Sequence, residues 1–304
     1  MEKNLFAGIT IFSLLIISFS GCIDNNLNED YKSIQESIND ADEGDTIYIQ
    51  NGTYYETLVI NKSINLIGED RNTTIIKCKK SCKTDHIDII YVNADNCTIR
   101  GFEITNTNVS SDIIGIYINS SNNTISNNII SRTNMGIYFH IHSNNNDVYK
   151  NKISNNQEGI TLIYSHNNNI SKNNISLNSA CGIGVHSLSQ GNMFSSNVII
   201  DNKNGIHFAD GTKNKIFKND FIGNIRGVYL CCGAQNNILY NNVFKQNSES
   251  NARDVKNNRW YINSIGNYWD DYMGVDKDGD GIGDEPYNVS GGNNQDIYPR
   301  INPR

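Results

Sequence analysis

The sequence predicts an all-β protein, a parallel β-helix with a short N-terminal helix and an irregular, acidic C-terminal tail; a family resemblance given below adds that the β-helix is right-handed and that the helix caps it. Three observations predict the parallel β-helix: a repeat of about 22 residues, short apolar segments that alternate as strands do, and two asparagine series with the same spacing. Such a period is typical of solenoids, in which each repeat buries its apolar face only against its neighbours.

The repeat runs from residue 115 to 243 and contains three markers, a glycine and two Asn-x-apolar motifs. The glycines are Gly115, Gly136, Gly159, Gly182, Gly205 and Gly227. The first asparagines are Asn123, Asn146, Asn168, Asn192, Asn214 and Asn236, and the second are Asn128, Asn151, Asn173, Asn197, Asn219 and Asn241. Both asparagine series advance by 23, 22, 24, 22 and 22 residues, and this agreement excludes a chance pattern.

The segments between the turns alternate, as in Ile137/Phe139 and Ile160/Leu162, so one side of each strand points inward. Three such strands fill a coil, and equivalent residues of successive coils then lie about 4.8 Å apart. Each asparagine series is therefore expected to form a column of stacked amides, which avoids an unpaired interior group at a cost of roughly 1–3 kcal/mol. Asparagine also tolerates the left-handed backbone that sharp corners need.

Residues 1–22 have the features of a lipoprotein-type signal segment, with Lys3 ahead of a mostly apolar stretch. The small pair Ser20-Gly21 before Cys22 resembles the lipobox of prokaryotic lipoproteins, in which the cysteine is lipidated. An uncleaved anchor and plain secretion are the alternatives. All three place the protein outside the cytoplasmic membrane, and a lipid or an anchor would hold it on the outer face. Residues 23–30 follow as a polar tether.

Residues 31–252 are expected to form the β-helix, with its regular coils over 115–248. Ile34, Ile38 and Ala41 recur at helical spacing and predict a short helix over the first coil. Early strands are expected at Thr46–Ile49, Leu58–Ile60, Ile64–Ile67, Thr74–Ile76, Ile87–Val92 and Thr98–Ile104.

The stretch IQESINDADEGDTIYIQNGTYYETLVINKSINLIGE, residues 34–69, resembles the entry segment of right-handed β-helix proteins of the carbohydrate-binding and sugar-hydrolase (CASH) type and of the NosD family of periplasmic copper-accessory proteins. The segment GNYWDDYMGVDKDGDGIGDEPYNVSGGNNQDIYP, from Gly266, resembles the tail of archaeal surface β-helix proteins of NosD type. The resemblance implies a helix that shields the first strand edge. It is specific for fold rather than activity, since relatives differ in function.

Residues 253–304 are expected to form a C-terminal cap. Between Trp260 and Asp296 the chain has eight acids and one lysine, a net charge of −7 that equals the charge of the whole protein. The coils are therefore near neutral and offer no basic face for nucleic acid.

The sharpest local motif in this cap predicts a calcium site. Carboxylates at positions 1, 3, 5 and 9, a glycine at 6 and a backbone carbonyl at 7 match the ligand spacing of EF-hand-like loops. These ligands are Asp276, Asp278, Asp280, Asp284 and the carbonyl of Ile282. Tyr287 stands where the bidentate acid is usual, so Glu285, Asp270, Asp271 or water would complete the shell. The alternative is a solvated acidic turn.

Outward positions two and four residues after the repeat glycines predict a second site, a sheet face for polysaccharide or envelope glycan. Its residues are Tyr117, Tyr138, His140, His186, His207 and Tyr229. Aromatic rings beside amides suit a sugar chain, whereas the β-propensity of tyrosine gives a purely structural alternative.

Copper is the third candidate ligand, because His140, His142, His186 and His207 with Cys231 and Cys232 include imidazole and thiolate donors. His140 and His186 should lie two coils apart, about 9.6 Å, which is too far for one ion. No local cluster is evident in the sequence, so dispersed surface histidines remain the alternative. Adjacent Cys231 and Cys232 are expected to point to opposite faces.

Six cysteines remain besides Cys22, and an extracytoplasmic setting permits disulfides. Cys78 with Cys82 is the most plausible bridge, since it would clamp a loop between early coils.

The sequence favours a binding or envelope role over catalysis, and it predicts no catalytic residue. Lyases, hydrolases and epimerases that act on polysaccharides need acids clustered on one face. The acids of the repeats do not share a coil position; they are Asp147, Glu158, Asp201, Asp210 and Asp220. A NosD-like copper-accessory protein is the first alternative, and a polysaccharide-cleaving or epimerising enzyme is the second.

Overall fold

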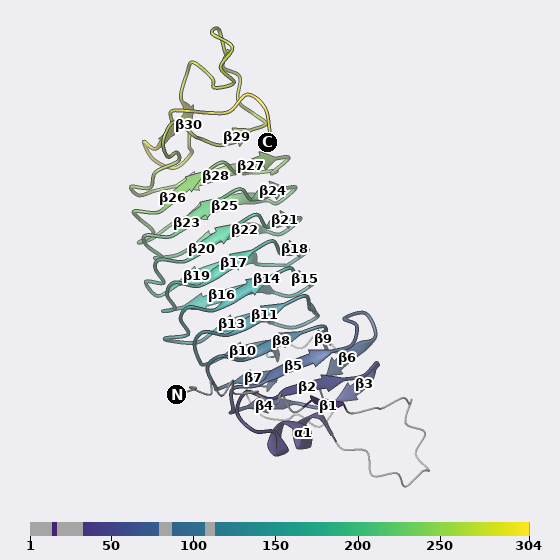
Figure 1. Ribbon diagram of the computed structural model, residues 1–304. Helices are drawn as coiled ribbons and strands as arrows, with labels where there is room; N and C mark the ends of the chain where they lie inside the picture. Colours follow the sequence, from purple (N-terminus) through teal and green to yellow (C-terminus); the bar gives the residue numbers. More distant parts are fainter. Residues whose placement is uncertain (1–13, 17–32, 79–86, 107–112, 304) are drawn as a thin grey trace, which may run out of the picture.

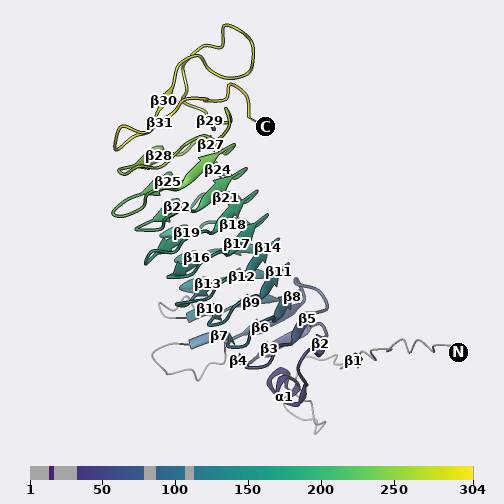
Figure 2. The ribbon, with the colours of Figure 1, turned by 60° about the vertical axis from the view of Figure 1, so that its left-hand side comes forward.

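The computed structural model describes residues 14–16, 33–78, 87–106 and 113–303, and it is a parallel β-helix (Figure 1). Each coil contributes one strand to each of three parallel sheets, named A, B and C in the order in which the chain visits them. The coils stack into a long, narrow column with the C-terminal loops at one end and the helix α1 at the other (Figure 2). The predicted fold class is confirmed.

The strands of sheet A are β1 (Leu14–Ile16), β2 (Thr46–Ile49), β5 (Asn65–Gly68), β8 (Thr98–Arg100), β11 (Thr124–Ser126), β14 (Asp147–Tyr149), β17 (Asn169–Ser171), β20 (Met193–Ser195), β23 (Lys215–Phe217) and β26 (Ile238–Tyr240). Those of sheet B are β3 (Gly52–Tyr55), β6 (Thr74–Lys77), β9 (Glu103–Thr105), β12 (Ile129–Ser131), β15 (Lys152–Ser154), β18 (Asn174–Ser176), β21 (Val198–Ile200), β24 (Asp220–Ile222), β27 (Val243–Lys245) and β29 (Tyr268–Trp269). Those of sheet C are β4 (Leu58–Ile60), β7 (Ile87–Val92), β10 (Ile113–Ile118), β13 (Met135–Phe139), β16 (Glu158–Ile163), β19 (Cys181–His186), β22 (Asn204–Phe208), β25 (Arg226–Leu230) and β28 (Ser250–Asp254). A hairpin of β30 (Tyr287–Asn288) and β31 (Gln295–Asp296) lies in the C-terminal cap.

The early coils differ from the prediction at one corner. The single strand expected over Thr98–Ile104 is divided into β8 and β9, because Gly101 adopts a left-handed φ of 85°. A Cβ atom on Gly68 would lie 2.2 Å from the Gly101 carbonyl oxygen, so these two backbones approach too closely for a side chain.

The helix α1 (Ile34–Asp40) closes the N-terminal end of the column (Figure 1). Ser33 and Glu36 form a capping box at its start, and Ile34 and Ile38 are buried against the first coil. Within the described residues, no helix has the length and apolar character needed to cross a bilayer.

Columns of stacked asparagine side chains run along the corners of the β-helix. Asn168 Oδ1 accepts from the backbone N–H and the side-chain amide of Asn146, at 2.9 and 3.0 Å, and the Asn168 amide donates to Asn192 at 3.2 Å. The column between sheets C and A contains Asn123, Asn146, Asn168, Asn192, Asn214, Asn237 and Asn258. The column between sheets A and B contains Asn128, Asn151, Asn173, Asn197, Asn219, Asn242 and Asn267.

Two predicted members of these columns are wrong. Asn237 and Asn242 occupy the positions assigned to Asn236 and Asn241, which are each one residue too early. Asn236 and Asn241 have left-handed φ values of 59° and 54° and form the corners themselves. The expectation that the stacked asparagines adopt this conformation is therefore also wrong: from Asn123 to Asn242, the residue before each stacked asparagine has the left-handed φ.

A third column, between sheets B and C, was missed. It contains Thr133, Asn156, Asn178, Asn202, Asn224 and Asn247. All members except Asn247 precede a repeat glycine by three or four residues, and that spacing is the sequence signal that could have found them.

Carboxylates end all three columns, because the last amide of a directional chain needs a partner that only accepts. Asn258 donates to Asp254 at 2.8 Å, and Asn267 donates to Asp296 at 3.1 Å. The third column continues through Asn251 to the carboxylates of Asp270 and Asp271.

The C-terminal cap seals the open end of the core with stacked rings. Trp269 stacks on Phe244 at 4.4 Å between ring centroids and on Tyr287 at 4.1 Å. The indole N–H of Trp269 donates to Asp296 at 3.0 Å, so this one carboxylate joins the column end to the cap. Burial raises the pKa of Asp296 to about 6, against the opposing effect of the hydrogen bonds that it accepts.

Candidate functional site

The outer face of sheet C carries a column of aligned positions, formed by the residues two places after each repeat glycine and by Tyr91 in the coil before them. Strand register places Tyr91, Tyr117, Tyr138, Thr161, Gly184, His207 and Tyr229 on successive coils. The predicted glycan-face residues all lie on this outer face. The small residues Thr161 and Gly184 separate two groups on this face. The tyrosine-rich group contains Tyr91, Tyr117, Tyr138 and His140, and the histidine-rich group contains His186, His207 and Tyr229.

The tyrosine-rich group consists of packed rings. Tyr117 lies 5.2 Å from Tyr91 and 5.0 Å from Tyr138 between ring centroids, and His140 lies 5.5 Å from Tyr117. The Asn119 amide donates to the Tyr91 hydroxyl at 3.0 Å. Burial raises the pKa of both the Tyr117 and the Tyr138 phenol. The Tyr117 ring is tilted by 52° to each of the Tyr91 and Tyr138 rings, so the group does not present one flat surface for stacking against a sugar ring.

In the histidine-rich group, three donor atoms surround the empty Cβ position of Gly184, although they do not all lie within 4.8 Å of one another. The point where a Cβ atom would stand on Gly184 lies 2.8 Å from His186 Nε2. The same point lies 3.1 Å from Glu158 Oε2 and 3.4 Å from Cys181 Sγ. The absent side chain therefore leaves a cradle lined by an imidazole, a carboxylate and a thiol.

His207 connects this cradle to a second sulfur. Its ring lies 5.7 Å from the His186 ring between centroids, and its Nε2 lies 3.4 Å from the Cys231 Sγ. The expectation of dispersed histidines is wrong for this pair, since adjacent coils bring the two rings together. We call Glu158, Cys181, His186, His207 and Cys231 the histidine–cysteine cluster.

The electrostatics of the cluster favour neutral ligands. Burial, and then the neighbouring His186, lower the pKa of His207, so its imidazole stays neutral into mildly acidic solution. Burial, and then the Glu158 carboxylate, raise the pKa of the Cys181 thiol well above its usual range. Burial and contact with Cys232 raise the pKa of Cys231 to about 11. A soft cation would therefore have to displace the thiol protons on binding.

The donor set of the cluster fits copper by its chemistry. Thiolate sulfur favours copper(I) and imidazole suits copper in general. Metal–nitrogen and metal–sulfur bonds are about 2.0–2.3 Å in comparable protein sites, which is shorter than the separations around Gly184. Binding would therefore need the side chains to turn inward. Sequence reasoning missed Glu158 and Cys181, although both stand directly before a repeat glycine.

Cys231 and Cys232 do not point to opposite faces, so that expectation is wrong. Their sulfur atoms lie 2.9 Å apart. Cys232 has a left-handed φ of 59° in the turn after β25, and this conformation breaks the alternation of an extended strand.

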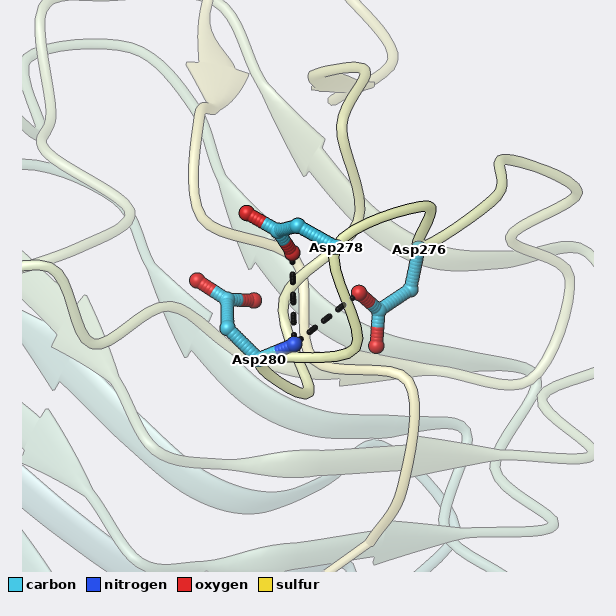
Figure 3. Close-up of side chains that lie close together, drawn as sticks. All are labelled: Asp276, Asp278 and Asp280. Atoms are coloured by element: carbon cyan, nitrogen blue, oxygen red, sulfur yellow. Dashed lines mark hydrogen bonds between the residues drawn. The ribbon is translucent and has the colours of Figure 1, made fainter.

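The acidic loop in the C-terminal cap brings three carboxylates together (Figure 3). One oxygen from each of Asp276, Asp278 and Asp280 lies within 4.8 Å of the others. Asp276 accepts from the backbone N–H groups of Gly279 and Gly281, at 2.8 and 2.9 Å.

The Asp284 carboxylate, a further predicted calcium ligand, is not part of this group of three. The Asp284 carboxylate accepts from the Lys277 backbone N–H at 3.1 Å, and the Ile282 N–H donates to Asp280 at 2.8 Å. Two further predicted positions, Cys22 for lipidation and Cys82 as the partner of Cys78, lie outside the described residues.

Comparison with known proteins identifies relatives for most of the β-helix. Residues 38–230 match the family described as periplasmic copper-binding protein (NosD). A probable ABC transporter binding protein NosD from Pseudomonas aeruginosa is 32% identical over 93 residues, which are 29% of this chain and 21% of that protein. The match thus spans about a fifth of the length of this curated relative.

Solved structures share the fold. The Dettilon tailspike protein has a TM-score of 0.56 and 15% identity, over 83% of this chain and 60% of that chain. The catalytic domain of a GH87 alpha-1,3-glucanase in complex with nigerose has a TM-score of 0.55 and 16% identity, over 82% and 47%. At these identities the similarity shows the β-helix alone.

Proposed function

Because the chain belongs to the NosD family, whose members are described as periplasmic copper-binding proteins, we propose that it binds copper(I) through the histidine–cysteine cluster on the outer face of sheet C. His186, His207 and Cys231 are the principal donors. Cys181 and Glu158 flank them and adjust the charge of the site. The observation that carries this proposal is the His207 Nε2–Cys231 Sγ separation of 3.4 Å beside the cradle at Gly184.

Copper(I) titration of the reduced, full chain against a chromophoric chelator tests the proposal. We expect stoichiometric uptake by the wild type and a loss of affinity of at least about tenfold in His207→Ala or Cys231→Ser, since even outer partners of metal ligands contribute that much. His142→Ala is the matched control, because His142 is an exposed histidine outside the cluster. Equal affinity in all four proteins, or no uptake by the wild type, would refute the assignment.

A second proposal is that the tyrosine-rich group binds an envelope or external glycan. Its support is a row of polar groups along one face: Asn119 donates to the Tyr91 hydroxyl, and its carbonyl contacts His140 Nδ1 at 3.0 Å. Such a row suits hydrogen bonding along a sugar chain rather than ring stacking. Binding on a glycan array that persists in Tyr229→Ala but disappears in Tyr138→Ala would support this proposal. A blank array would eliminate it.

The anchoring of the protein is also a proposal. NosD proteins are described as periplasmic, so the family is extracytoplasmic. We propose that a lipid on Cys22 attaches this chain to the outer face of the cytoplasmic membrane. The sequence before Cys22 supports this, and metabolic labelling with a fatty acid, compared between the wild type and Cys22→Ala, tests it.

We further propose that Ca²⁺ binds the loop of Asp276, Asp278 and Asp280 and orders the C-terminal cap. The support is the spacing of these carboxylates and their proximity, since three uncompensated charges so close together repel one another. Isothermal titration calorimetry with Ca²⁺ tests this proposal. A binding heat in Asp278→Asn equal to that of the wild type would count against the site.

A further inference from the structure

Cys231 and Cys232 form a contacting pair of thiols at the rim of the histidine–cysteine cluster. Their sulfur atoms are 2.9 Å apart, compared with about 2.05 Å in a disulfide. The turn that holds them is fixed by backbone hydrogen bonds: Cys231 N–H donates to Phe208, and Ala234 N–H donates back to Cys231, at 2.9 and 3.0 Å. The backbone hydrogen bonds therefore hold in place the turn from which the two sulfurs approach each other.

The two thiols differ in exposure and in neighbours. Cys231 is buried, with 9% of its surface exposed, and faces His207, whereas Cys232 is exposed to solvent. An external disulfide can therefore reach Cys232 first. Thiol–disulfide exchange then needs a second thiol nearby to resolve the mixed disulfide, and Cys231 stands in that position.

We propose that Cys231 and Cys232 form a reversible vicinal disulfide that switches off the copper site. This inference rests on the proposed copper function, because Cys231 is one of its donors. The switch adds a redox input: the reduced protein binds copper(I), and the oxidised protein binds it weakly.

The oxidant is a protein or low-molecular-weight disulfide. The Cys232 sulfur, as its thiolate, attacks one sulfur of that disulfide and releases one thiol. The Cys231 sulfur then attacks the mixed disulfide at Cys232 and expels the second sulfur as a thiolate, which takes up through solvent the proton that Cys231 loses and leaves as the second thiol. In total the cysteine pair loses two electrons and two protons, and the oxidant disulfide becomes two thiols.

Geometry explains why such a bond would be reversible. Consecutive Cα atoms across a trans peptide are about 3.8 Å apart, whereas disulfides usually join Cα atoms about 4.4–6.8 Å apart. A bond between neighbours is strained, and strained disulfides are the readily reduced ones. Once the bond forms, the Cys231 sulfur has no thiolate to offer a metal, so His207 loses its sulfur partner.

The test compares the full chain after reduction with a phosphine and after incubation with oxidised glutathione. Free thiols are blocked, and the peptide that contains both cysteines is weighed. We expect it to be lighter by two hydrogens and without a blocking group after oxidation. Copper(I) affinity, measured by competition with a chelator, should fall at least about tenfold relative to the reduced protein.

Cys232→Ser is the matched control, because it keeps Cys231 and removes its partner. Its copper(I) affinity should not change with oxidised glutathione. A peptide that keeps two blockable thiols, or a disulfide that leaves the affinity unchanged, overturns the switch. If the reduced wild type takes up no copper(I), the proposed function fails instead, whatever the mass of the peptide shows.

Discussion

His207 Nε2 lies 3.4 Å from the sulfur of Cys231, although 24 residues separate them in the chain. One coil of the β-helix converts that separation into a contact between neighbouring strands. The same step places His186 beside His207, so one turn of the column brings imidazole and sulfur donors together. The copper proposal depends on this stacking.

The asparagine columns should make a large contribution to stability. Asn168→Ala removes the acceptor of two Asn146 groups and a donor to Asn192, and we expect it to lower the free energy of unfolding by about 2–4 kcal/mol. Asn169→Ala is the control, because the Asn169 side chain donates to Asp147 at the surface, and it should cost less than about 0.5 kcal/mol. Urea unfolding measures both; equal losses would contradict a structural role for the column.

Replacing the corner residue Leu177 should stabilise the protein. Leu177 has a left-handed φ of 57° and is 54% exposed, so it bears a steric cost without a large gain from burial. We expect Leu177→Asn to raise the free energy of unfolding by about 0.5–1 kcal/mol, since asparagine tolerates this conformation.

Met193→Asn is the comparison for this corner, because Met193 is 40% exposed but lies in the extended strand β20. It should bring no gain, since asparagine is unfavourable in strands. Stabilisation of both variants to the same extent would show that removing exposed apolar surface, and not the corner conformation, is responsible.

Asp296 should make stability depend on pH. Its pKa is about 6 in the folded protein and 3.8 when unperturbed, so between these values the folded state holds a proton that the unfolded state releases. Acidification from pH 7 to pH 5 should therefore favour folding at this site, by at most about 1.4 kcal/mol per pH unit.

The variant Asp296→Asn isolates this effect, because it cannot titrate but still accepts from Asn267 and Trp269. The difference in melting temperature, wild type minus variant, should increase as the pH falls through 6. If the melting temperatures of the wild type and the variant change equally with pH, the Asp296 carboxyl group is not the cause of the pH dependence.

Calcium should stabilise the cap. If the loop binds Ca²⁺, an excess of 100 times the dissociation constant adds about 2.7 kcal/mol to the folded state, and EDTA removes this gain. Asp278→Asn with Asp280→Asn should abolish the response, while Asp147→Asn, at an exposed acid in β14, should keep it. Differential scanning calorimetry with and without Ca²⁺ measures the effect, and a wild type that does not respond would remove the site.

The coils could be predicted from the sequence because two separate markers, the first and the second asparagine series, show the same period. The doublets Asn236-Asn237 and Asn241-Asn242 could not be resolved in the same way, since either residue continues the series within one position. Only the hydrogen bonds to Asn214 and Asn219 decide which asparagine is stacked. The third column begins with Thr133 instead of an asparagine, and most of its asparagines have a polar residue two positions later, so the Asn-x-apolar motif did not include it.

The site was harder to predict than the fold. Alternation correctly places His186 and His207 on the outer face, but it fails at Cys232, where a left-handed turn ends the strand. Glu158 and Cys181 precede their glycines, outside the two positions that were compared between coils. Their convergence depends on the missing side chain of Gly184, and a sequence pattern does not show such a vacancy.

X-ray absorption at the copper edge of the reduced, copper(I)-loaded protein tests the central claim most directly. The proposed site predicts a mixed shell of nitrogen and sulfur around copper, with the sulfur contribution reduced in Cys231→Ser and the nitrogen contribution reduced in His207→Ala. A shell without sulfur, or one that neither substitution alters, would contradict a copper site on the outer face of sheet C.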